Sequence, residues 1–118
     1  MDYLPNAAEA ATLTLCLGRD YAEEKGTRLT RFRISNRSLR EISGRSHLRD
    51  VFLEEWAAAL DQMGWKVIWC GDHNGLIRKD AIDGWSRLSS KRIASQLKGM
   101  NATTVKRLRR GLRRSEFV

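Results

Sequence analysis

The chain has 118 residues, 42% of them hydrophobic and 31% charged, and 22 Lys and Arg against 14 Asp and Glu give it a formal net charge of +8. That length predicts one small domain with a modest core, and no apolar run approaches the ~20 residues of a bilayer-spanning helix, so we expect no membrane partner. Residues 1–5 lack the basic start and apolar run of a secretory signal, so we expect a cytoplasmic protein whose Cys16 and Cys70 are reduced and buried.

The basic residues are segregated along the sequence. Residues 25–49 contain eight bases against one acid, and residues 86–118 contain ten bases against one acid. Residues 1–24 and 50–85 each have a net negative charge. Dense basic surfaces attract phosphate backbones and release their counterions, so this pattern favours a nucleic acid as the partner over a merely solvated surface.

A first helix is expected over residues 7–24. Asn6 and Glu9 have the spacing of a capping box at its start, and Gly26 is a natural stop beyond its end. Its outer face is acidic, so we expect it to support the core rather than to contact nucleic acid. The apolar stripe that should face the core consists of Ala10, Leu13, Leu17 and Tyr21.

A strand and a pair of helices are expected next. Residues 27–35 alternate between apolar and basic side chains, which is the period of a half-buried strand. A short helix over residues 36–43 should stop at Gly44. A longer helix over residues 47–63 should follow, with Ser46 as its N-cap.

A β-hairpin is expected after the long helix. Residues 65–70 and 75–79 flank the Gly-Asp-His-Asn-Gly segment 71–75, which is a turn signal between two apolar runs. A turn should follow over residues 80–84, and Trp85 is expected to anchor this segment against the core.

Within residues 1–85, the helix pair joined at Gly44-Arg45-Ser46 and the hairpin that follows it resemble the winged helix-turn-helix superfamily over about half the chain. The resemblance is one of element order. It implies an α+β, winged-helix-like domain that binds double-stranded DNA, with the hairpin as the wing. In a helix-turn-helix the first helix crosses the DNA backbone and the second enters the major groove.

The long helix suits the groove only at its first turn, because its outer face carries carboxylates that phosphates would repel. The candidate base contacts are therefore Arg45, Ser46, His47 and Arg49. The candidate backbone contacts in the same domain are Arg31, Arg33, Arg37, Arg40, Arg78 and Lys79.

Residues 86–118 are expected to form a basic helical extension, packed on the domain or trailing from it. Ser89 or Ser90 can cap a helix over residues 91–98 whose Ile93, Ala94 and Leu97 face inward. Asn101 can cap a final amphipathic helix with the apolar residues Val105, Leu108 and Leu112. The candidate backbone contacts of the extension are Lys91, Arg92, Lys106, Arg107, Arg109, Arg110, Arg113 and Arg114.

The sequence therefore predicts a small DNA-binding regulator or accessory factor that acts by occupancy. An alternative is a small inhibitor or adaptor, of the kind mobile elements encode, that binds a nucleic-acid-associated protein complex; the acidic long helix and an exposed Leu53 would favour it. A third is RNA binding through the arginine-rich extension. A homodimer stays open. With neither a catalytic constellation nor metal-ligand spacing around His73, we expect no enzyme, cofactor or metal.

Overall fold

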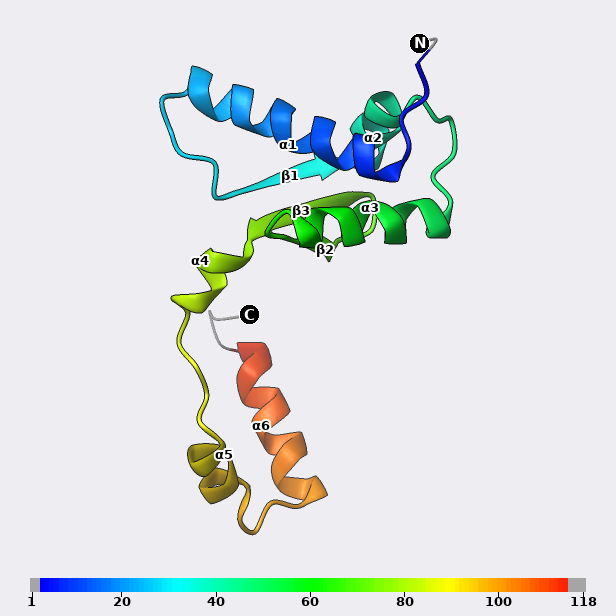
Figure 1. Ribbon diagram of the computed structural model, residues 1–118. Coiled ribbons are helices and arrows are strands. Elements are labelled where there is room, and N and C mark those ends of the chain that lie inside the picture. Colours follow the sequence, from blue (N-terminus) through cyan, green and yellow to red (C-terminus); the bar gives the residue numbers. More distant parts are fainter. Residues whose placement is uncertain (1–2, 115–118) are drawn as a thin grey trace. The chain divides into compact units, whose positions relative to one another are not determined.

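The computed structural model describes residues 3–114 and has an α+β fold in which a three-stranded antiparallel sheet is combined with helices (Figure 1). It divides into two compact units, Met1–Trp85 and Ser86–Val118. In chain order the elements are α1 (Ala7–Glu24), β1 (Arg31–Ser35), α2 (Asn36–Ser43), α3 (Asp50–Gln62), β2 (Trp65–Trp69), β3 (His73–Arg78), α4 (Lys79–Asp83), α5 (Ser90–Leu97) and α6 (Ala102–Arg114).

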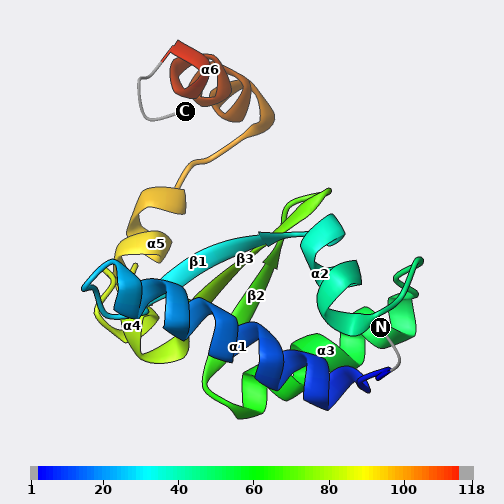
Figure 2. The ribbon, with the colours of Figure 1, turned by 90° about the horizontal axis from the view of Figure 1, so that it is seen from above.

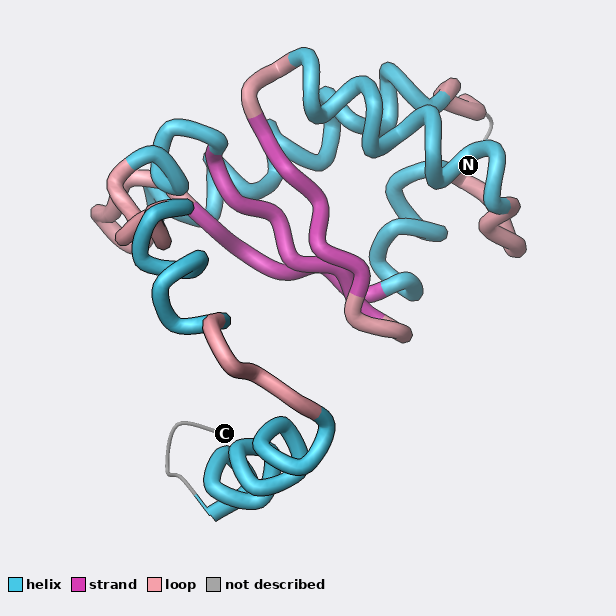
Figure 3. Tube along the Cα trace, turned by 90° about the horizontal axis from the view of Figure 1, so that it is seen from below, coloured by secondary structure: helices cyan, strands magenta, loops and turns pink. Residues whose placement is uncertain are grey.

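The sheet of the first unit has the strand order β1-β3-β2, with β3 in the centre (Figures 2 and 3). Phe32 of β1 pairs with Leu76 of β3, which pairs with Val67 of β2. This row faces the helices, because all three side chains belong to the core cluster or pack against it. One face of the sheet is therefore covered by α1, α2 and α3.

The core of this unit is centred on Trp56 of α3, whose side chain is fully buried. Its indole N–H donates a hydrogen bond to the hydroxyl of Thr14 in α1 at 3.3 Å, and that hydroxyl donates to the carbonyl of Ala10 at 2.7 Å. Trp56 thus fills the space between α1 and the sheet while its one polar group stays hydrogen-bonded.

Helix α1 has the predicted bounds, and its capping box between Asn6 and Glu9 is confirmed. The predicted apolar stripe is wrong in its second half: Ala10 is buried and Leu13 half-buried, but Leu17 and Tyr21 are 53% and 63% exposed. The buried side consists of small residues, which let the large Trp and Phe side chains of α3 and β1 approach the helix axis. The buried residues of α1 are Ala7, Ala10, Ala11, Thr14, Gly18 and Ala22.

The bounds of α2 agree with the prediction from the sequence, whereas the start of α3 does not. Helix α2 has its predicted bounds and ends at Gly44, whose φ of 66° is left-handed. Helix α3 begins at Asp50 rather than at residue 47, so the prediction of Ser46 as its N-cap is wrong. Leu48 packs against the core before the helix begins, and residues 45–49 form a non-helical connection.

The hairpin is present, but its turn is shorter than predicted, since β3 begins at His73. The turn expected over residues 80–84 is the short helix α4, which is joined to the sheet by a 2.9 Å bond from the Lys79 N–H to the Gly64 carbonyl. Trp85, which follows α4, is 58% exposed, so the prediction that it anchors this segment against the core is wrong.

The second unit contains the two predicted helices. Ser89 caps α5 by accepting from the Arg92 N–H, and Asn101 accepts from the Thr104 N–H at the start of α6. Within the second unit Ile93 and Leu97 of α5 are not buried, being 40% and 56% exposed, so the prediction that they face inward is not confirmed.

Two further expectations concern the cysteines and membranes. Both cysteines are free, with Cys16 half-buried and Cys70 exposed, so the predicted burial of Cys70 is wrong because it lies where β2 ends at the hairpin turn. None of the helices within residues 3–114 is long and apolar enough to cross a bilayer.

Candidate nucleic-acid interface

The four predicted base contacts lie in the connection between α2 and α3. Together with Gly44 and Phe52 they line one surface hollow of about 360 Å³. Ser46, His47 and Arg49 are exposed, whereas Arg45 is half-buried. The fold therefore gathers these side chains at one place, although they lie before α3 and not in its first turn.

The half-buried Arg45 side chain is held by contacts with its own chain. Its Nη1 donates to the carbonyl of Pro5 at 2.6 Å and to the carbonyl of Ser43 at 3.0 Å. Its guanidinium carbon also lies 4.3 Å from the centre of the Phe52 ring, a cation–π contact. The side chain thus fixes the α2–α3 connection against the segment before α1, a role that no local signal in the sequence indicated.

The basic residues of α2 lie next to this connection. Arg37 and Arg40 line a neighbouring hollow of about 480 Å³ that also includes Gly44, Arg45 and Ser46. Arg37 is exposed and Arg40 is half-buried. Glu41 lies in the same hollow, so its charge partly offsets the two guanidinium groups.

Arg31 and Arg33 lie on the sheet face opposite the helices. The exposure of β1 alternates as predicted, with both arginines exposed and Phe32 half-buried between them. Arg33 is paired with Gly75 of β3, and Gly75 with Ile68 of β2, which is 51% exposed. These two arginines therefore stand at the edge of a partly apolar surface.

Arg78 and Lys79 are engaged with acids of their own chain. Arg78 lies 3.0 Å from Asp80, and Lys79 lies 2.9 Å from Asp61 of α3, which also contacts Lys66 at 3.1 Å. Hydrogen bonds from Lys79 and Lys66 lower the pKa of Asp61. Both predicted backbone contacts thus have their charge shared with a nearby carboxylate.

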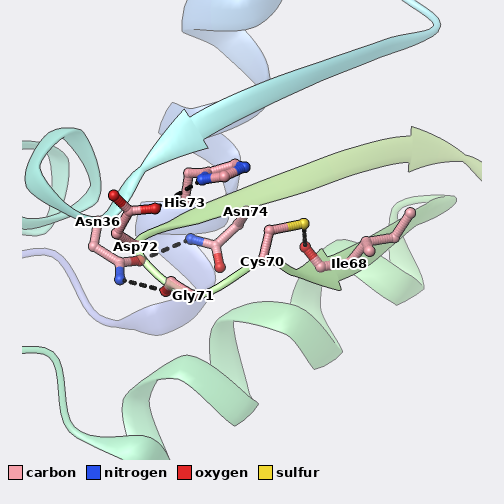
Figure 4. A network of polar contacts seen from close by, with 7 residues as sticks. All are labelled: Asn36, Ile68, Cys70, Gly71, Asp72, His73 and Asn74. Carbon is pink, nitrogen blue, oxygen red and sulfur yellow. Dashed lines mark hydrogen bonds and ion pairs between the residues drawn. The ribbon is translucent and has the colours of Figure 1, made fainter. Parts of the chain in front are cut away.

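The hairpin turn is tied to the first residue of α2 (Figure 4). The Asn36 side-chain amide donates to the Gly71 carbonyl at 3.1 Å and accepts from the buried Asn74 amide at 3.0 Å. The Asp72 carboxylate lies 2.9 Å from Nδ1 of His73, and this contact lowers the pKa of Asp72. The turn is fixed in place and carries an acid at its tip.

The predicted contacts of the second unit lie on α5 and α6. Six of them have exposed side chains: Lys91, Arg92, Lys106, Arg107, Arg109 and Arg110. The side chains of Arg113 and Arg114 lie outside the described part of the chain. No ion pair involves the described residues of this unit, so their charges are directed to solvent.

The described residues contain no group of three or more His, Cys, Asp or Glu side chains that could hold a metal ion. Comparison of the chain with protein-family models, with curated proteins and with solved structures found no match.

Proposed function

We propose that this protein binds double-stranded DNA and acts by occupancy, as a small regulator or accessory factor. The observation that carries the proposal is the α2–α3 connection, where Ser46, His47 and Arg49 are exposed around one hollow beside the arginines of α2. Exposed basic and hydroxyl side chains in the connection between two helices are suited to contact phosphates and base edges.

The element order of the first unit supports the proposal. Helix, strand, helix, helix and hairpin follow one another around the sheet order β1-β3-β2, and this is compatible with a winged-helix-like arrangement. In that arrangement α2 would cross the DNA backbone, with Arg37 and Arg40 on phosphates. The β2–β3 hairpin, held by Asn36, would be the wing.

The charge of α3 restricts how DNA could approach. Asp50, Glu54 and Glu55 are exposed on this helix, so lying along the groove would bring three carboxylates toward phosphates. An approach by the connection alone avoids this repulsion. In this proposal Arg45 positions the connection, and Ser46, His47 and Arg49 make the contacts.

A salt series of binding to random duplex DNA, with duplex RNA and single-stranded DNA as competitors, tests the proposal. We expect duplex binding that weakens steeply with salt and that Arg49→Ala weakens further. Arg19→Ala is the matched control, because Arg19 is an exposed arginine beside Asp20 and Glu23 on α1. Absence of duplex binding at moderate salt, or a stronger preference for RNA, would overturn it.

A second candidate, protein binding, is favoured by a groove of about 820 Å³ between α1, β1 and α2. Leu17 and Tyr21 are exposed along it, and Phe32 and Ile42 line it. The Leu53 side chain, by contrast, packs against the core, so the expectation that it is exposed at a protein interface is wrong.

The edge of β1 beside this groove has unpaired backbone groups. The Arg78 N–H bonds to the Thr30 carbonyl, and the Asn36 N–H bonds to the Asp72 carbonyl. Because hydrogen-bonded pairs alternate in an antiparallel ladder, the backbone groups of Arg31 and Arg33 point away from β3. They can pair with an added strand.

The occupant that fits this edge is an extended segment of another protein in which acidic and apolar residues alternate. Its acidic side chains would meet Arg28, Arg31 and Arg33, while apolar ones would enter the groove. A second copy fits poorly, because antiparallel pairing of two β1 strands would bring Arg31 and Arg33 close to their own copies.

A peptide of alternating valine and glutamate, titrated while backbone amide resonances are followed, tests this candidate. We expect the peptide to shift the amide resonances of residues 31–35 in the wild type and in Arg33→Ala, but not in Arg33→Pro. Proline removes the backbone N–H that would bond to the peptide, and an edge strand tolerates proline. Equal binding by both variants, or shifts elsewhere only, would overturn the docking mode.

A further inference from the structure

The second unit contains a helix pair with a short connection. Helix α5 ends at Leu97 and α6 begins at Ala102, so residues 98–101 join them. Gly99 in this connection has a left-handed φ of 71°, which lets the chain reverse, and Asn101 then caps α6. This connection has the length and the glycine of a helix-turn-helix turn, while α5 has no buried residue.

Helix α6 has one apolar side and one polar side. At about 100° per residue, Val105, Leu108 and Leu112 share the first side. The opposite side carries Thr103, Lys106, Arg107 and Arg110, which are all exposed. These four residues, called here the basic side of α6, occupy the N-terminal two thirds of the helix, where a recognition helix makes its base contacts.

The charge of α6 differs from that of α3. From Ser86 to Arg114 the sequence contains no Asp or Glu, whereas α3 contains Asp50, Glu54, Glu55 and Asp61. A helix without carboxylates can lie in the major groove along its length without repelling either strand. On this criterion α6 fits a groove and α3 does not.

We propose that α6, which follows α5 after this short connection, enters the major groove of duplex DNA through its basic side. Arg107 has the guanidinium fork that pairs bidentately with guanine, and Thr103 can contact base edges near the helix start. Lys106 and Arg110 are placed to contact phosphates or neighbouring bases. Lys91 and Arg92 at the start of α5 contact the backbone.

This inference rests on the proposed function in requiring duplex DNA, but it concerns different residues. It changes the role of the C-terminal segment from sequence-independent attachment to base recognition. A protein with the α2–α3 connection and α6 both on DNA would recognise bases through residues of two different units.

Selection of preferred duplexes from a randomised pool by the full-length protein tests the inference. Binding of the selected duplex is then measured for the wild type and for Arg107→Ala, Arg109→Ala and Arg49→Ala. Arg109→Ala is the matched control, because it removes the same charge from the same helix, but Arg109 lies 40° from Val105, beside the apolar side. Circular dichroism checks that each variant is folded.

We expect Arg107→Ala to lower the preference for one base position by about tenfold and Arg109→Ala to weaken all duplexes alike. Equal effects of the two variants on preference would overturn the inference while leaving the proposed function intact. If only Arg49→Ala changed the base preference, the inference would also be overturned and the proposed function would stand. No binding to any duplex would reject the proposed function itself, and a preference for RNA that depends on Arg107 would reassign α6 to RNA.

Discussion

The guanidinium carbon of Arg45 lies 4.3 Å from the centre of the Phe52 ring, so a cation of the α2–α3 connection lies over a core side chain of α3. The same guanidinium donates to the carbonyls of Pro5 and Ser43. The connection proposed to contact DNA is thus held by one of its own arginines. Arg45 has a structural role, whereas Arg49, four residues later, is exposed.

Arg45→Ala should destabilise the protein by about 1–3 kcal/mol, because two carbonyls lose a charged donor and the ring loses its cation. Arg49→Ala is the control and should change the free energy of unfolding by less than about 0.5 kcal/mol, since this side chain is exposed. Urea unfolding measures both. Similar unfolding midpoints for the two variants would contradict the structural role of Arg45.

Thr14→Val should cost about 1–3 kcal/mol, because the buried indole N–H of Trp56 would lose its acceptor while the shape of the side chain is kept. Thr12→Val provides the comparison. Its hydroxyl also donates to a helix carbonyl, that of Ala8 at 3.2 Å, but at an exposed position. Thermal unfolding of the pair should show a loss of stability for Thr14→Val only.

Gly18→Ala should destabilise the protein although alanine favours helices, because its Cβ would lie 3.0 Å from Cζ of Phe32 and 3.2 Å from Cδ2 of Leu29. Gly111→Ala should have the opposite effect and stabilise helix α6 by up to about 1 kcal/mol, since alanine favours helices and nothing lies within 4 Å of the new methyl group. A rise in melting temperature for Gly18→Ala would show that α1 and β1 pack less closely than described.

Stability should fall as pH is lowered below about 4, partly through Asp61. Lys79 and Lys66 lower the pKa of this carboxyl from 3.8, so the folded state binds its proton less readily than the unfolded state. The contribution is therefore complete above the unfolded value and is lost as pH falls through the folded one. Asp61→Asn should therefore flatten the acid branch of the curve of unfolding free energy against pH, as urea unfolding at a series of pH values would measure.

Lys91→Ala combined with Arg92→Ala should weaken binding to all duplexes alike. If both side chains contact phosphates, the slope of log K against log salt should become shallower by about 2, since each phosphate contributes about 0.9. The salt series with random duplex measures this slope. An unchanged slope would mean that the start of α5 does not touch DNA.

Local signals predicted the helix ends well. Asn6 with Glu9, Gly44 after α2, and Asn101 before α6 each act through bonds or backbone angles within a few residues, so the sequence contains the whole interaction. Helix α3 departs from this rule, because it begins at Asp50 with Arg49 as its N-cap although Ser46 is the better capping residue.

The candidate site was only partly predictable. Exposure of Ser46, His47 and Arg49 followed from polarity and position, but the engagement of Arg45 depends on Pro5, 40 residues earlier in the chain. Lys79 likewise meets Asp61 only because α4 and α3 are brought together by the sheet. Contacts between distant residues leave no periodic pattern for a reader of the sequence.

The element order, the helix caps and the two basic blocks could be predicted from the sequence, since these depend on residues close together in the chain. The folded structure alone shows which side of α1 is buried, which arginine of the α2–α3 connection is held, and that Asn36 bonds to the hairpin turn. These features depend on the packing of large side chains against small ones and on hydrogen bonds between residues 35 to 40 positions apart in the sequence. Such contacts form only once the chain has folded.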